Sequence, residues 1–216
     1  MFLSFSLFTQ SYCELFSIEC SDAKVFYQNH KSEFDNSSSG TNLTGKFLFS
    51  IVAPEITQYN WLKDKAESMA LKVLYVQQGN SYADFSIGNF QMKPSFIESM
   101  EKFVQKDAVK LSEFLPLIIK ENDIKQARIL RLKRMEQLEW QLTYLKLFVK
   151  IVAIQFSNKT FNNENEKLKF YASAYNCGFL KSESIIEKTS EKKYFPFFSL
   201  YKFKYKEIAE WFFIES

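Results

Sequence analysis

The sequence predicts a mainly α-helical protein, and three observations support this fold class. Glycine and proline, the residues that most often interrupt helices, number only 5 and 4 among 216 residues. Apolar residues recur three and four positions apart over several long stretches, which is the spacing of a buried helix face. Hydrophobic residues make up 46% and charged residues 25% of the chain, which is typical of a globular protein that can bury a core.

A polar stretch at residues 36–42, Asn-Ser-Ser-Ser-Gly-Thr-Asn, predicts a boundary between an N-terminal segment, 1–42, and a main domain, 43–216. The first residues read MFLSFSLFTQS, which is apolar but lacks the basic residues that start a secretory signal. We therefore interpret them as a truncated or atypical signal peptide, or as a first buried segment. Cys13 and Cys20 can form a disulfide if the protein is exported, and are otherwise two reduced thiols.

The main domain is predicted to begin with two helices. The first starts at Lys46, and Pro54 either kinks or ends it. The second runs from Leu62 to Gln77 and stops before Gly79. The residues expected to face inward on this second helix are its apolar ones, Ala66, Met69, Ala70, Val73 and Leu74.

Further helices are predicted at 96–104, 123–156, 166–176 and 204–213. The 123–156 stretch has the longest periodicity, and its charged residues fall on the face opposite the apolar one. Those charged residues are Arg128, Arg131, Lys133, Arg134 and Glu139. We interpret them as a solvated helix face. No run reaches the roughly 18 apolar residues of a membrane-spanning helix, so no membrane span is expected.

Charge and residue content exclude several classes of protein. The net charge is +3, from 28 basic and 25 acidic residues, which is too balanced to indicate nucleic-acid binding. The single histidine, His30, lies in a polar stretch and is predicted at the surface, so a Ser-His-Asp triad or a multi-histidine metal site is not expected. The three cysteines form no CxxC motif. We therefore expect neither a metal nor a cofactor.

Glu55 is the first candidate for a chemical role. It lies three and four positions after Val52 and Ile51, which places its carboxyl on an apolar helix face. Burial of a carboxyl raises its pKa and keeps it protonated near neutral pH, as a general acid requires. The alternative is that Glu55 only follows Pro54 in the first turn of a helix.

Two later motifs place polar groups next to turns. Gly88-Asn89-Phe90-Gln91-Met92-Lys93-Pro94 predicts a tight bend entering a helix, which can bring the Gln91 amide to the floor of a groove. Ala174-Tyr175-Asn176-Cys177-Gly178 predicts a helix end, where the tips of Tyr175 and Asn176 are free to meet a ligand. Taken separately, each motif also fits an ordinary turn or cap.

In this order, the three motifs resemble those of the lytic transglycosylase and goose-type lysozyme superfamily. That family shows a Glu at the end of an apolar helix, a Gly-Leu-Met-Gln-like turn followed by Pro, and an Ala-Tyr-Asn-Ala-Gly helix end. The stretch 139–145, with Tyr144-Leu145, also resembles the family's helix with a Tyr-Leu pair. The resemblance covers about residues 46–178 and implies a lysozyme-like helical domain with a substrate groove.

The chain departs from the family pattern at the acid. The family has Ser after its Glu, whereas here Ile56 follows Glu55. Glu67-Ser68 has the expected pair and lies nearer to Gly88, so Glu67 is the alternative acid. We favour Glu55 because Glu67 follows a polar run that would not raise its pKa.

The resemblance implies an exported, monomeric enzyme of the periplasm or cell envelope that cleaves peptidoglycan between N-acetylmuramic acid and N-acetylglucosamine. Glu55 would act as general acid and base without metal or water, giving a 1,6-anhydro product. A hydrolase would instead need a second carboxyl, with Asp84 and Glu67 as candidates. The resemblance assigns substrate binding to Gly88, Phe90, Gln91, Tyr144, Tyr175 and Asn176, with Tyr59 also near the groove. A non-catalytic wall-binding protein remains the alternative, as does a partner-binding protein that uses the basic face of 128–134.

Overall fold

The computed structural model describes residues 11–59 and 65–216, with the side chains of 65–68 left out. Helices make up 66% of the chain and no strand is present in the described ranges, so the mainly α prediction is confirmed. The two short pairings that do occur are isolated bridges, Ile87 with Met92 and Phe195 with Phe203. No helix in the described ranges has the length and apolar character needed to span a bilayer.

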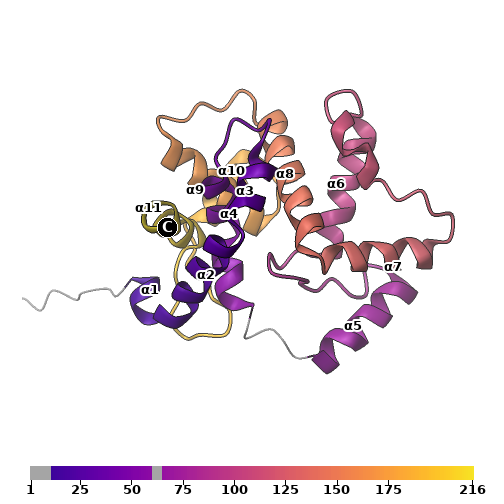
Figure 1. The fold of residues 1–216 in the computed structure, drawn as a ribbon, viewed down its shortest axis with the longest axis horizontal. Coiled ribbons are helices and arrows are strands. Elements are labelled where there is room, and N and C mark those ends of the chain that lie inside the picture. The colour runs from indigo at the N-terminus through magenta and orange to yellow at the C-terminus, as the bar shows by residue number, and fades with distance from the viewer. Residues whose placement is uncertain (1–10, 60–64) are drawn as a thin grey trace, which may run out of the picture.

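The helices follow one another in the order shown in Figure 1. Their bounds are α1 Tyr12–Leu15, α2 Ser17–Asn29, α3 Lys31–Ser38, α4 Gly45–Gln58, α5 Lys65–Gln78, α6 Pro94–Lys106, the 3₁₀ helix η1 Ser112–Leu117, α7 Ile124–Met135, α8 Leu138–Gln155, α9 Glu164–Cys177, α10 Glu183–Ser190 and α11 Tyr205–Glu215. The predicted single helix over 123–156 is therefore two helices, which meet at Glu136 and Gln137.

The helices form two groups with α8 between them (Figure 1). In one group, α2, α3, α9 and α11 surround α4. In the other, α5 packs on α7, and α6 packs on η1. Helix α8 contacts α3 and α9 on one side and α6 and α7 on the other, so it joins the two groups.

Helix α4 is central because its sequence is apolar on every side. Phe47, Leu48, Phe49, Ile51, Val52 and Ala53 are all completely buried. A helix without a polar face has to be enclosed by others. The hydroxyl of Thr44 caps it by accepting a hydrogen bond from the Phe47 N–H at 3.1 Å. The helix runs through Pro54 to Gln58 instead of ending there, so Glu55 lies inside its last turn.

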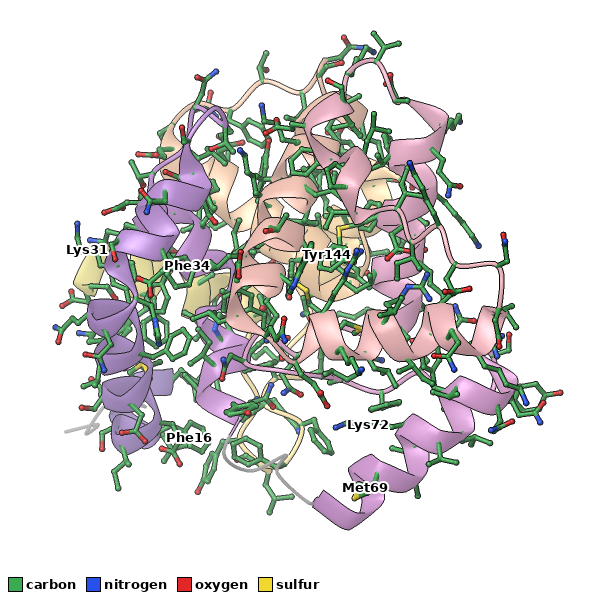
Figure 2. All side chains as sticks on the ribbon, turned by 45° about the vertical axis from the view of Figure 1, so that its right-hand side comes forward. Phe16, Lys31, Phe34, Met69, Lys72 and Tyr144 are labelled. Carbon is green, nitrogen blue, oxygen red and sulfur yellow. A yellow bond between two sulfur atoms is a disulfide. The ribbon has the colours of Figure 1, made fainter. Side chains whose placement is uncertain are left out.

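The described part of the N-terminal segment, residues 11–42, packs on this core. Helices α2 and α3 pack against α4, and α3 extends through the polar stretch that predicted a boundary. Phe34 of α3 is completely buried, with its ring 5.7 Å from that of Phe49 and 5.8 Å from that of Phe90 (Figure 2). Cys13 and Cys20 are joined by a disulfide. The contacts of α2 and α3 with α4 thus cross the boundary predicted after residue 42.

The predicted inward face of α5 is wrong. Met69 and Val73 are 67% and 61% exposed, and Leu74 is 39% exposed. Tyr75 is the buried residue of this helix. The side chain of Ala66 and the start predicted at Leu62 lie outside the described residues. The inward side of α5 is set by a polar anchor at Tyr75, which apolar periodicity cannot detect.

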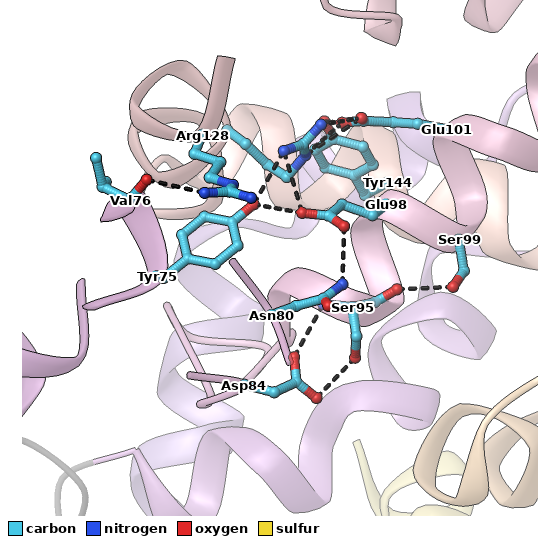
Figure 3. A network of polar contacts seen from close by, with 11 residues as sticks. Tyr75, Val76, Asn80, Asp84, Ser95, Glu98, Ser99, Glu101, Arg128 and Tyr144 are labelled. Atoms are coloured by element: carbon cyan, nitrogen blue, oxygen red, sulfur yellow. Dashed lines mark hydrogen bonds and ion pairs between the residues drawn. The ribbon is translucent and has the colours of Figure 1, made fainter. Parts of the chain in front are cut away.

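That anchor belongs to a buried ion network that connects four helices (Figure 3). Arg131 of α7 pairs with Glu101 of α6 at 2.6 Å and with Glu98 at 3.3 Å. The Tyr75 hydroxyl of α5 donates to Glu98 at 2.6 Å. The Tyr144 hydroxyl of α8 donates to Glu101 at 3.0 Å. The network fixes α5, α6 and α7 against α8.

Two sequence predictions are corrected by this network. Arg131 was expected on a solvated face, but only 9% of it is exposed. Tyr144 was expected to bind substrate, but it is completely buried and its hydroxyl is used by Glu101. Both residues therefore have structural roles, because a charged group buried here requires partners on every side.

Gly88 begins a turn that is pressed against the junction of α7 and α8. Its φ is +73°, and a Cβ placed there would lie 2.3 Å from the Gln141 Nε2 and 2.6 Å from the Met135 carbonyl oxygen. The Gln141 side chain accepts a hydrogen bond from the Phe90 N–H at 3.0 Å. Phe90 is completely buried and packs on Phe34. Gly88 and Phe90, both predicted to bind substrate, instead form the base of the turn.

We expect Gly88→Ala to destabilise the fold by about 2–4 kcal/mol, because strain at positive φ adds to a collision with backbone. Gly40→Ala is the matched control, since Gly40 has a φ of +74° and the nearest atom to its added Cβ would be 4.0 Å away. The control should lose only about 1 kcal/mol. Urea denaturation measures both variants. Equal losses in the two would mean that the close approach to Gln141 and Met135 has no cost.

Candidate active site

An open cavity of about 840 Å³ lies between α4, the turn at 85–93, α6, the end of α9 and the loop at 191–204. A cavity of this size can hold a small-molecule ligand and is much larger than a site for a single ion. Four of the predicted site residues line it together, namely Glu55, Gln91, Tyr175 and Asn176. Gly88, Phe90 and Tyr144 are not among the lining residues.

Glu55 is placed on the cavity wall by the last turn of α4. Glu55 is half-buried, and burial of its carboxyl raises the pKa of that carboxyl to about 8. The Tyr205 hydroxyl, the positive charge of Lys93 and the Gln58 amide each lower that pKa, and burial outweighs them. The Gln58 Nε2 donates to the Glu55 Oε2 at 3.4 Å. The carboxyl is therefore protonated at neutral pH, which makes it a proton donor facing an open cavity.

Gln91 lines the same cavity, and its side-chain amide has an unpaired acceptor. Its Nε2 donates to the Gly88 carbonyl at 2.7 Å. This hydrogen bond within the turn fixes the orientation of the amide. Its Oε1 is buried and has no hydrogen-bond partner in the described part of the chain. Its φ of +48° is unusual for a residue with a side chain. A buried carbonyl without a partner is costly, so Gln91 is a lining residue with an unmet hydrogen bond.

Tyr175 lines the cavity but does not offer a free hydroxyl, which corrects one prediction. Only 7% of it is exposed, and its hydroxyl donates to the Phe90 carbonyl at 2.6 Å. Its ring packs edge-on against Phe96 and Phe148 at 5.3 Å and 5.2 Å. Tyr175 therefore ties α9 to the turn that carries Gln91. It positions the turn and leaves ligand contact to other groups.

Asn176 and Tyr194 form a polar edge beside the acid. The Asn176 Nδ2 donates to the Tyr194 hydroxyl at 2.5 Å, and both residues line the cavity. Asn176 is half-buried and Tyr194 is 38% exposed. Burial, with smaller contributions from the nearby Cys177 and Glu55, raises the pKa of Tyr194 to about 12. Tyr194 thus stays protonated and can donate its hydroxyl proton to a sugar oxygen.

Tyr205 is the residue near the acid that sequence reasoning missed. Its hydroxyl donates to the Ile51 carbonyl at 2.9 Å, and Tyr205 also lies beside Glu55, whose pKa it lowers. It comes from α11, which was predicted only as a last helix. The hydrogen bond joins residues 154 positions apart. Nothing in the KYKEIAEWFF stretch indicates that contact, because it depends on how α11 packs on α4.

The alternative carboxyls have other roles or are not described. Asp84 caps α6, with its two oxygens accepting from the Ser95 N–H at 2.9 Å and the Ser95 hydroxyl at 2.7 Å (Figure 3). It is not among the residues that line the cavity, and neither is Tyr59. Glu67 belongs to α5, and its side chain lies outside the described residues.

In residues 11–59 and 65–216 no group of three or more His, Cys, Asp or Glu side chains is arranged to hold a metal ion. His30, predicted at the surface, is half-buried and bonds to Glu33 at 3.1 Å.

No protein-family model, curated protein or solved structure matches the chain.

Replacing Tyr205 by phenylalanine is expected to raise the pKa of Glu55 above its value of about 8, because the hydroxyl that lowers it is lost. The measurement is a ¹³C NMR titration of the Glu55 side-chain carboxyl in the folded protein. Tyr171→Phe is the control, since Tyr171 is a buried tyrosine of α9 whose pKa is raised by burial alone. A titration of Glu55 that is the same in both variants would show that the Tyr205 hydroxyl does not act on the acid.

Proposed function

We propose that this protein cleaves the glycan strands of peptidoglycan between N-acetylmuramic acid and N-acetylglucosamine, as a lytic transglycosylase. The observation that carries the proposal is a carboxyl with a pKa of about 8 on the wall of an open cavity of about 840 Å³, which Gln91 also lines. A protonated carboxyl beside a space of this size fits glycoside cleavage. The resemblance of the three motifs supports the same reaction.

The reaction would need one carboxyl. Protonated Glu55 donates its proton to the glycosidic oxygen as the bond from C1 of the muramoyl sugar to that oxygen breaks. The Glu55 carboxylate then accepts the proton of the muramoyl 6-hydroxyl, whose oxygen bonds to C1 and closes a 1,6-anhydro ring. The glycan gains no water, and Glu55 ends protonated as it began.

The acidic residues around the cavity favour this non-hydrolytic course. Glu55 is the only Asp or Glu among the described residues that line it. An inverting hydrolase needs a second carboxyl about 6.5–9.5 Å from the first to activate water. Asp84, the described candidate, is held by Ser95 at the start of α6.

The remaining polar groups suit an amide-bearing, anionic sugar polymer. The Tyr194 hydroxyl can donate to a ring substituent, and the Gln91 and Asn176 amides line the same cavity. Lys93 and Lys181, both exposed, line the cavity and bring positive charge to it. That charge complements the lactyl and peptide carboxylates of muramic acid.

The proposed substrate places the protein outside the cytoplasmic membrane, in the periplasm or cell envelope. The Cys13–Cys20 disulfide fits that setting, because disulfides persist in oxidising compartments. We propose that the protein acts there as a monomer on the glycan strands, without a cofactor.

The test is to incubate the purified protein with peptidoglycan sacculi and to weigh the soluble fragments by mass spectrometry. Anhydro-muropeptides are the expected product. Fragments with reducing ends, heavier by one water, would replace this proposal by a lysozyme-like hydrolase. Sedimentation with sacculi without any fragments would replace it by a non-catalytic wall-binding protein, which the absence of the family's Ser after Glu55 keeps as the second candidate.

A further inference from the structure

The loop between α10 and α11 displays apolar side chains to solvent. Phe197 is 69% exposed, Leu200 98% and Tyr201 64%. The loop lies at the lower edge of the molecule in Figure 1, next to α1 and the end of α4. Contiguous exposed apolar residues on a globular protein indicate a surface that contacts something other than water.

The loop is held in this shape rather than left loose. Its ends pair through Phe195 and Phe203, whose N–H···O distances are 3.2 Å and 2.7 Å. The Lys202 Nζ donates to the carbonyls of Pro196 at 2.7 Å and Phe197 at 3.1 Å, which closes the loop from inside. The structure therefore holds the tip residues outward, at no further cost in ordering when they bind.

Aromatic packing fixes the loop on the N-terminal helices. The Phe198 ring packs edge-on against Phe16 at 5.8 Å, and Phe16 also contacts Phe203 at 6.4 Å. Figure 2 labels Phe16 at the lower side of the molecule, where Met69 of α5, 67% exposed, also lies. The apolar tip therefore belongs to a side of the molecule that carries further exposed apolar residues.

Two exposed lysines, Lys192 and Lys193, lie three and two residues before Phe195. The preceding Glu191 is paired with Lys204 and Lys206, so its negative charge is balanced. Tyrosine and phenylalanine beside lysine is the composition of protein segments that enter the boundary between lipid headgroups and acyl chains. The lysines suit anionic headgroups, and their positive charge acts over about one Debye length.

The sequence before α1 has the same character. Residues 1–8 read Met-Phe-Leu-Ser-Phe-Ser-Leu-Phe, which is an apolar sequence. The tip itself is a single projecting turn. A protein partner would need an interface of about 1,000 Å² or more with matching shape, whereas a lipid surface accepts a projecting apolar tip of any shape.

We propose that the 195–203 loop docks this protein on the surface of an anionic lipid bilayer, with Leu200 and Tyr201 inserted and Lys192 and Lys193 at the headgroups. Phe197 belongs both to the loop and to the cavity wall. Docking through the loop thus places the cavity next to the membrane surface. The proposal is independent of the reaction in the cavity.

The test is sedimentation of the full chain with vesicles of phosphatidylcholine, with and without phosphatidylglycerol. We expect Leu200→Asp combined with Tyr201→Asp to lower the vesicle partition coefficient at least about ten-fold. Neither residue lines the cavity. Lys192→Gln combined with Lys193→Gln should remove the gain from phosphatidylglycerol and leave the remaining binding.

Val109→Asp is the matched control, because it places the same charge at a 90% exposed residue in the turn after α6, at the other end of the molecule (Figure 1). Residues 1–10 are retained in every variant, so the differences report on the loop. Wild-type protein that stays in the supernatant would overturn the proposal, as would unchanged binding of the Leu200 and Tyr201 variant. Concentration-dependent dimers without vesicle binding, lost in that variant, would overturn it in favour of a second copy covering the loop.

Discussion

Replacing Glu55 by glutamine is expected to lower the rate of sacculus cleavage by about 10²–10⁴-fold, because glutamine cannot donate a proton to the glycosidic oxygen. Anhydro-muropeptide release measures the rate. Binding to sacculi should be kept, since Glu55→Gln preserves size and hydrogen-bonding capacity. Full activity in this variant, together with an inactive Glu67→Gln, would move the acid to α5.

The same substitution should change stability with pH in a direction that identifies the buried carboxyl. Below about pH 4.5 Glu55 is protonated in both the folded and the unfolded chain. Between that pH and about 8 the unfolded chain loses the proton while the folded chain keeps it. The unfolded state is therefore stabilised relative to the folded state. Ionisation of Glu55 lowers the free energy of unfolding by about 1.4 kcal/mol per pH unit over this range. Glu55→Gln removes the loss, so the variant should gain stability over the wild type as pH rises.

Urea denaturation at pH 5 and pH 8 measures this difference. Glu139→Gln, at an exposed position of α8, is the control. The difference in free energy of unfolding between this variant and the wild type should be the same at both pH values. A gap between wild type and Glu55→Gln that is constant with pH would mean that the carboxyl is solvated in the folded state. The chemical role proposed for it would then have no physical basis.

Arg131→Ala should destabilise the protein by about 3–5 kcal/mol, because it leaves the carboxylate of Glu101 buried without its counter-charge. Glu101 is only 6% exposed, and its pairing with Arg131 is bidentate, with contacts of 3.2 Å and 2.6 Å. The loss should be measured as the free energy of unfolding in urea. It should be accompanied by release of α5, whose Tyr75 hydroxyl accepts from the Arg131 Nη1 at 2.9 Å.

Lys31→Ala is the control for Arg131→Ala, since it breaks an exposed ion pair with Asp35 of 3.0 Å on one helix. Such a pair contributes about 0.3–0.5 kcal/mol. If Arg131→Ala cost no more than Lys31→Ala, the network would be accessible to water and would not hold α5, α6 and α7 against α8.

The sequence predicted the helical class and the neighbourhood of the acid, but not the polar contacts that set the packing. Glu55 and Gln91 were identifiable because local patterns mark them: a carboxyl after an apolar run, and a Gly-Pro-bounded turn. Tyr144 and Arg131 were assigned wrongly because a pattern of apolar residues does not show that polar side chains from distant helices bury one another. Tyr175 was located at the correct helix end, but the use of its hydroxyl by Phe90 depends on tertiary packing alone.

Tyr205 shows the limit more clearly, since its contact with Ile51 bridges 154 positions in the chain. Met69 and Val73 of α5 show the opposite case. Their spacing is that of a core face, yet no described element covers them. Periodicity reports that a helix has an apolar side, whereas the position of the other helices decides whether that side is covered.

The enclosure of α4 on all sides has a consequence for the time scale of motion around the cavity. Its backbone amides can exchange with solvent only when the whole domain opens, whereas α5, with its outward apolar residues, can detach at a much smaller free energy. Glu55 thus lies on a helix whose amides are expected to exchange slowly, while Leu71 brings α5 to the same cavity. A ligand in the cavity would therefore contact one rigid helix, α4, and one helix, α5, that moves more readily.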